Sequence, residues 1–295
     1  MSNTLRSCVD DISFCATEFL PTGESRNITL FCLPGGGASA QYFDLHPNFS
    51  FAVKMAARGF RVVTMDHPGT ATNPLSTDYP FLTPRQAADL IARALGDFTD
   101  GSPVIGIGHS MGGMVATLVQ ARHSAFEALG LFGSSAGGLE WGLSEAERKY
   151  IDQPDAFEKD IQALTLGKFG CEFTSIPAGP SGKSITFGGE TPELTQSLRD
   201  ASCELFAAGG MMSMVRGSFR TEVEAIDVPM MFAFGDHDIG IPPAEAPKAY
   251  INAPTTELVI LDKTGHNHFA FKSIESLCAN LDHWISNLDS VSRKR

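Results

Sequence analysis

The sequence is short of basic residues. Lysine and arginine together number 22, against 34 aspartates and glutamates, which gives a formal net charge of −12 at pH 7. A chain of that sign repels the phosphate backbone of DNA and RNA. We therefore expect no nucleic-acid partner.

Long apolar runs are also missing. No stretch approaches the roughly 20 consecutive apolar residues that a membrane-spanning helix needs. Residues 1–11 show no basic region followed by an apolar run, the pattern of a secretory signal. The sequence predicts no membrane span and, as the default, a cytoplasmic location.

Cysteine is sparse and scattered. The spacing fits neither a zinc site nor a small disulfide scaffold, so we expect mostly reduced thiols and no bound metal. The six positions are Cys8, Cys15, Cys32, Cys171, Cys203 and Cys278.

What the chain does have is apolar material, with 43% hydrophobic residues in 295. Short β-branched or apolar runs alternate with helix-like stretches, a rhythm that predicts an α/β fold with a parallel sheet and crossover helices. The predicted strands are 28–33, 61–65, 104–107, 129–132, 229–234 and 257–261, and the predicted core helices are 51–58, 83–95, 111–123 and 269–288.

The rhythm stops at the glycine- and serine-rich run 133–138. Residues 139–227 carry helix-like segments at 144–150, 154–166 and 193–214 instead. We interpret 139–227 as an inserted helical cap, called the insertion below. It splits one core domain into a first part, 1–138, and a second part, 228–295.

The segment 104–113 has the sequence Val-Ile-Gly-Ile-Gly-His-Ser-Met-Gly-Gly, a buried strand that runs into a helix through Gly-x-Ser-x-Gly. Small residues are needed at Gly108 and Gly112 because the serine between them sits on a sharp, strained turn. This context predicts that Ser110 is a nucleophile. It also places the backbone N–H of Met111 at a helix start, where negative charge is favoured.

A serine hydroxyl becomes a good nucleophile only when a base takes its proton and a third group orients that base. Two later loops supply candidates, each directly after a predicted strand. The first loop carries Asp236 and Asp238, and the second carries His266 and His268. Both loops are predicted to lie at the same sheet edge as Ser110.

With these motifs the chain resembles the α/β-hydrolase superfamily of serine esterases, lipases and thioesterases, over nearly its whole length. The resemblance implies a central, mostly parallel sheet flanked by helices. The family acid is usually the second aspartate of Gly-x-x-Asp, which selects Asp238, with Asp236 as the alternative. The family histidine follows a glycine, which selects His266 and leaves His268 as a polar residue near the mouth of the site.

The resemblance also implies an oxyanion hole in the loop after an early strand, where this chain reads Leu-Pro-Gly-Gly-Gly-Ala-Ser over 33–39. The family's usual His-Gly is absent, but the donor is a backbone N–H. Gly36 is the best-placed donor and Gly37 the second, together with Met111. Each such donor stabilises the transition state by about 3–4 kcal/mol.

The implied reaction is hydrolysis of a carboxylic ester or lactone through an acyl-enzyme, without a cofactor. The glycine-rich run and the following Tyr42-Phe43 also resemble stand-alone thioesterases of assembly-line pathways, which is the first alternative. A carbon–carbon bond hydrolase, a lyase or cyclase, and a ligand receptor on the same fold stay open as well.

Substrate selection is expected to come from the insertion, which would roof an apolar pocket for a medium-sized ester, lactone or thioester. Methionine and phenylalanine fill irregular apolar space and adapt to varied partners. His109, beside the nucleophile, is expected to pack under the turn. The candidate substrate contacts are Gly37, His109, Phe206, Met211, Met212 and Met214.

Overall fold

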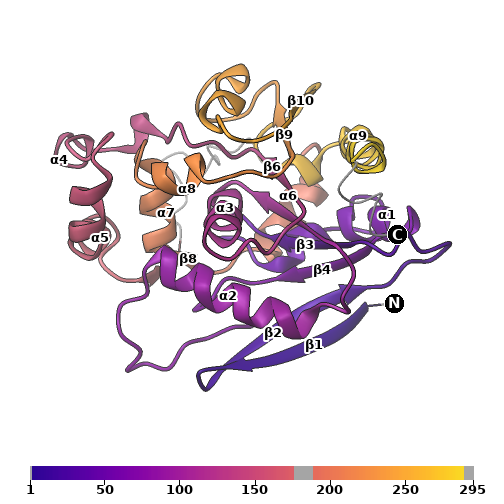
Figure 1. The fold of residues 1–295 in the computed structure, drawn as a ribbon, viewed down its shortest axis with the longest axis horizontal. Coiled ribbons are helices and arrows are strands. Elements are labelled where there is room, and N and C mark those ends of the chain that lie inside the picture. Colours follow the sequence, from indigo (N-terminus) through magenta and orange to yellow (C-terminus); the bar gives the residue numbers. More distant parts are fainter. Residues whose placement is uncertain (1, 176–188, 289–295) are drawn as a thin grey trace.

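A computed structural model describes residues 2–175 and 189–288. An eight-stranded sheet forms its centre, with the strand order β1-β2-β4-β3-β5-β6-β9-β10 (Figure 1). The six strands from β4 to β10 in that order pair in parallel. They are β3 (Thr29–Leu33), β4 (Arg61–Met65), β5 (Val104–His109), β6 (Ala128–Phe132), β9 (Met230–Gly235) and β10 (Thr256–Leu261).

The predicted parallel sheet is confirmed, since each of these strands lies within two residues of its expected bounds. Strands β3, β5, β6 and β9 are buried along their whole length. Such continuous apolar runs are typical of parallel strands that helices cover on both faces.

The antiparallel hairpin of β1 (Ser2–Val9) and β2 (Ile12–Phe19) was not predicted. Val9 pairs with Ile12 across a two-residue turn, and both turn residues, Asp10 and Asp11, have positive φ angles of 48° and 64°. Aspartate tolerates this conformation, and such turns match the twist of a hairpin. The hairpin adds an antiparallel edge to the sheet through β2 and β4.

Helices cover both faces of the sheet (Figure 1). One face carries α1 (Phe51–Ala57) and α9 (Ile274–Ser286), which share an apolar cluster. The other carries α2 (Pro84–Phe98) and α3 (Met111–His123). Helix α9 begins five residues later than predicted because a short 3₁₀ helix, η5 (His268–Ala270), precedes it.

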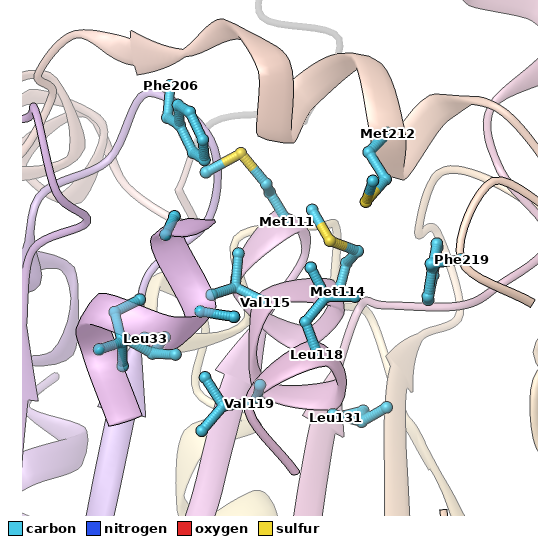
Figure 2. Close-up of a cluster of buried hydrophobic side chains, with 14 of the residues drawn as sticks. Leu33, Met111, Met114, Val115, Leu118, Val119, Leu131, Phe206, Met212 and Phe219 are labelled. Carbon is cyan, nitrogen blue, oxygen red and sulfur yellow. The ribbon is translucent and has the colours of Figure 1, made fainter. Parts of the chain in front are cut away.

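Helix α3 is unusual because Met111 to Gln120 are all buried. A helix with no exposed stripe needs cover on every side. The sheet supplies one side and α2 a second (Figure 1), and side chains of the insertion supply the third (Figure 2).

The insertion contains five α-helices, the 3₁₀ helix η2 (Glu140–Gly142) and two short strands within its described part. The predicted single helix 193–214 is wrong, because β8 interrupts it and pairs with β7. The elements are α4 (Glu145–Arg148), α5 (Pro154–Phe169), β7 (Phe173–Thr174), α6 (Pro192–Asp200), β8 (Leu205–Phe206), α7 (Ala207–Met214) and α8 (Arg220–Glu224). Across the described ranges, no helix is long and apolar enough to cross a membrane.

Apolar packing and ion pairs join the insertion to the core. Figure 2 shows Phe206 and Met212 of the insertion beside Met111 and Met114 of α3. On the flank, Arg85 of α2 pairs with Glu222 of α8 at 2.6 Å, and also with Glu158 of α5. The insertion is therefore packed down onto α3.

Candidate active site

Ser110 lies at the junction of β5 and α3 with φ 51° and ψ −122°, a backbone conformation that residues other than glycine rarely adopt. Its N–H donates to the Phe132 carbonyl at 2.8 Å, which ties the turn to β6. A Cβ at Gly108 would lie 2.4 Å from the Gly113 Cα, and one at Gly112 would lie 2.2 Å from the Leu33 carbonyl oxygen. Both glycines are therefore required by the close approach of backbone, as the sequence predicts.

Asp238 and His266 meet at the carboxyl ends of β9 and β10. Their contact is a hydrogen bond of 2.6 Å between His266 Nδ1 and Asp238 Oδ1. Gly133, at the end of β6, lies against the pair, since a Cβ there would be 3.1 Å from the His266 ring. The small residue leaves room for the imidazole beside the turn that carries Ser110.

Asp238 accepts four hydrogen bonds. Oδ1 also accepts the Ile239 N–H at 2.8 Å, and Oδ2 accepts the Gly235 N–H at 3.2 Å and His268 Nε2 at 2.7 Å. Burial by itself would raise the pKa of this carboxyl, but the hydrogen bonds from His266 and His268 outweigh burial and hold the pKa well below its usual range. Asp238 is thus an ionised group inside the protein.

His268 does not lie at the mouth of the site, so that expectation is wrong. Its side chain is 0% exposed, because η5 turns the chain back into the protein directly after His266. Sequence reasoning missed its contact with Asp238. The available signal was the pair of histidines two residues apart in one loop, opposite the loop that carries Asp236 and Asp238.

Asp236, the alternative acid, has another set of partners. Its carboxylate accepts the N–H groups of Lys263 and Thr264 at 3.0 and 2.9 Å and contacts His237. These contacts lower the pKa of Asp236 to about 2, with the Thr264 and Lys263 N–H groups as the main causes. Asp236 therefore links the two loops that carry Asp238 and His266.

His109 packs under the turn, as expected. Nε2 donates to the His266 carbonyl at 2.8 Å and lies 3.2 Å from the Tyr42 hydroxyl. Burial, followed by the neighbouring His266 and His268, lowers the pKa of His109 well below its ordinary value. A neutral His109 that holds the backbone of His266 is consistent with both observations.

The glycine-rich loop 35–39 is fixed from two sides. From the core, His67 Nε2 donates to the Pro34 carbonyl at 2.8 Å. From the insertion, the Cys203 N–H donates to the Gly37 carbonyl at 3.0 Å, and the Ser39 N–H donates to the Ala201 carbonyl at 2.8 Å. Gly36 borders Met111 on one side and Leu205 on the other. In the same loop, a Cβ at Gly35 would lie 3.2 Å from the Ser110 Cβ, so the loop passes close to the serine.

Within the described residues, no hydrogen bond joins the Ser110 hydroxyl to His266. Catalytic hydrogen bonds are often long or poorly aligned before substrate binds. Ser110 itself is partly exposed, while His266 is buried. The arrangement brings a serine hydroxyl and an oriented imidazole to one sheet edge.

The candidate substrate contacts fall into two groups. His109 directly precedes Ser110, and Gly37 lies in the glycine-rich loop, where its carbonyl accepts the Cys203 N–H. Phe206, Met211 and Met212 are instead fully buried in the apolar cluster over α3, and Figure 2 shows Phe206 and Met212 there. Met214 is half-buried, with its side chain toward Gly142. The underside of the insertion is thus filled with packed side chains.

Two hollows lie away from Ser110. One, of about 370 Å³, lies between α2 and the end of α3, and the other, of about 710 Å³, lies around Arg26 and Arg58. In the part of the chain that the structure describes, no three histidine, cysteine, aspartate or glutamate side chains are grouped to hold a metal ion.

Residues 30–273 match the sequence model of the alpha/beta hydrolase family. No curated protein matches the sequence. Among solved structures, a thioesterase domain from the curacin biosynthetic pathway superposes with a TM-score of 0.64 at 16% identity, over 98% of this chain and 100% of that chain. An N-acyl homoserine lactonase, AidH, gives 0.64 at 16% identity over 98% of both chains. A thermophilic esterase from Thermogutta terrifontis gives 0.62 at 14%, over 97% of this chain and 98% of that chain.

Proposed function

Because the chain belongs to the alpha/beta hydrolase family, we propose that it is a serine hydrolase that cleaves a carboxylic ester or lactone through an acyl-enzyme. The observation that carries this proposal is the buried Asp238–His266 hydrogen bond at the sheet edge where Ser110 occupies a strained turn. An ionised carboxylate on Nδ1 keeps the other ring nitrogen, Nε2, as the proton acceptor.

In the proposed reaction Ser110 Oγ attacks the substrate carbonyl carbon while His266 Nε2 takes the hydroxyl proton. The N–H groups of Gly36 and Met111 stabilise the resulting oxyanion. His266 then returns the proton to the leaving alcohol oxygen, which leaves an ester on Ser110. Water repeats the two steps, releasing the acid and restoring the serine. Asp238 stays ionised throughout.

The proposed substrate is medium-sized and largely apolar. The insertion's methionine and phenylalanine side chains support this, since such residues accommodate varied apolar groups. We propose Gly37 and His109 as contacts near the reacting carbonyl, and Phe206, Met211, Met212 and Met214 as contacts for the acyl chain. A cytoplasmic location and the core–insertion–core division at 139 and 227 belong to the same proposal.

The test is the intact mass after treatment with a fluorophosphonate, which phosphonylates activated serines. Wild type is expected to gain one adduct, and Ser110→Ala and His266→Ala none. Ser276→Ala, an exposed serine on α9, is the matched control and should label like wild type. Labelling of folded Ser110→Ala at the wild-type rate would refute the proposal.

Thioester hydrolysis is the second candidate, favoured by the run Leu33–Ser39 together with the similarity to the curacin thioesterase domain. Steady-state kinetics with an oxygen ester, a thioester and a lactone of the same acyl chain length distinguishes ester or lactone hydrolysis from thioester hydrolysis. The ratio of kcat/KM for the thioester to that for the oxygen ester is divided by the ratio of their rates of hydrolysis by hydroxide. A corrected ratio of at least about ten would favour the second candidate.

A further inference from the structure

Asp238 is hydrogen-bonded to two imidazoles, those of His266 and His268, and the proposed mechanism uses only His266. His266 Nδ1 is 2.6 Å from Oδ1, and His268 Nε2 is 2.7 Å from Oδ2. The carboxylate is 4% exposed and His268 is 0% exposed, so water does not compete for either contact. Two backbone N–H groups complete the shell of the carboxylate.

The hydrogen-bonding pattern fixes the tautomer of His268. An ionised carboxylate only accepts, so Nε2 must carry a proton. Nδ1 is buried and has no hydrogen-bond partner among the described residues. A protonated Nδ1 would be a buried, unsatisfied donor on a charged ring, which is costlier than an unfilled lone pair. His268 is therefore neutral, and burial, the main cause, lowers its pKa in the same direction.

We infer that His268 is a positioning residue: as a neutral donor it holds Oδ2 of Asp238 so that Oδ1 stays aimed at His266, and it draws part of the carboxylate's charge away from His266. This inference rests on the proposed function. It assigns His268 no contact with substrate. Its effect passes to the reaction through Asp238 alone.

The surroundings allow this role to be read from pH. The titratable groups that face the pair are His266 on the same loop, His109 at the end of β5, and Tyr42 on η1 (Ala40–Phe43). His109 is neutral, and burial, the main cause, raises the pKa of Tyr42 well above its ordinary value. Because His109 and Tyr42 are neutral, the charge that changes its surroundings when His268 is replaced is that of the Asp238 carboxylate.

The test compares His268→Leu, which removes the donor, with His268→Gln, whose amide nitrogen reaches about as far as Nε2 and does not titrate. Removing a hydrogen bond to a charged group is expected to lower kcat/KM on the order of 10- to 100-fold in the leucine variant, mainly through kcat. In the leucine variant the acidic limb of the pH profile of kcat/KM should move to higher pH. Asp238 then shares its charge with one imidazole instead of two, and this favours protonated His266. The glutamine variant should recover most of the activity and the wild-type limb.

His123→Leu is the matched control, since it removes an imidazole that contacts Asp89 at the far end of α3. It should change neither kcat/KM nor the acidic limb of its pH profile. Equal losses in the leucine and glutamine variants, or a leucine variant with an unmoved limb, would overturn the inference. So would loss of fluorophosphonate labelling in folded His268→Gln with retention in His266→Gln, which would exchange the two roles. Failure of wild type to label would instead refute the proposed function.

Discussion

Asp236 and Asp238 lie two residues apart, and each side chain is expected to have a different role. Asp238→Asn presents an amide where His266 needs an acceptor, so kcat/KM should fall about 10³- to 10⁴-fold with little loss of fold. Asp236→Asn should leave most activity but destabilise the loops it joins. Steady-state kinetics on both variants checks this, and a larger kinetic loss in Asp236→Asn would reverse the assignment of the acid.

The pH dependence of stability follows from Asp236 as well. Its pKa is lowered to about 2 in the folded protein from an ordinary 3.8, so its stabilising effect is present above about pH 4 and is lost as the pH falls toward 2. We expect Asp236→Asn to be less stable than wild type at pH 7 and to match it near pH 2. Urea unfolding at a series of pH values measures the difference, and a constant gap across that range would contradict it.

The residues that sequence reasoning identified are those with a local signature. The strained turn around Ser110 needs small neighbours, which are visible as Gly108 and Gly112. The role of His268 has no such signature, because it depends on a carboxylate thirty residues away and on the turn of η5. Burial of that side chain could not be inferred from its polarity.

At the scale of elements, the crossing of α3 over the end of β3 limits what Gly112 can become. A Cβ there would lie 2.2 Å from the Leu33 carbonyl oxygen, and backbone cannot move aside cheaply. Gly112→Ala should therefore lower the free energy of unfolding by about 3 kcal/mol. Gly96→Ala in α2 is the control, since nothing lies within 4 Å of its Cβ position. It should gain roughly 0.5–1 kcal/mol. Similar values in chemical denaturation would contradict the packing argument.

A second junction joins the insertion to the loop 35–39. Cys203→Pro removes the N–H that donates to the Gly37 carbonyl, whereas Cys203→Ala keeps it. Ser202 forms an extended bridge with Ala38, so a following proline is compatible with its conformation. We expect the proline variant alone to lose about tenfold in kcat, the cost of a loosened oxyanion donor being smaller than that of a missing one. Equal kcat values in both variants would show that this bond does not position the donor.

Elements with a mostly apolar sequence were predicted well, and an exposed strand with weak alternation was not. The strand–turn–helix at 104–123 was correct to within two residues, because its strand and most of its helix are buried and mostly apolar. Strand β1 mixes polar and apolar residues on an exposed edge, so its alternation is weak. The break between α6 and α7 depends on pairing between β8 and β7, a contact about thirty residues apart in the sequence.

At the scale of the whole molecule, the insertion and the core share one apolar cluster. Separating them would return Phe206, Met211 and Met212 to water, at about 1.5–3 kcal/mol for each side chain. It would also leave the nearly buried carboxylate of Glu222 without Arg85. Helix α7 should therefore open only when the core unfolds, whereas α6, with Leu194 as its single buried residue, can open alone.

Hydrogen exchange followed by mass spectrometry distinguishes these motions. Amides in residues 207–214 should exchange with the same free energy as those in 111–123, and amides in 192–200 should exchange much faster. That order would show that α6, which contacts η5, opens without α7. Exchange of α7 as fast as that of α6 would instead mean that the whole insertion lifts.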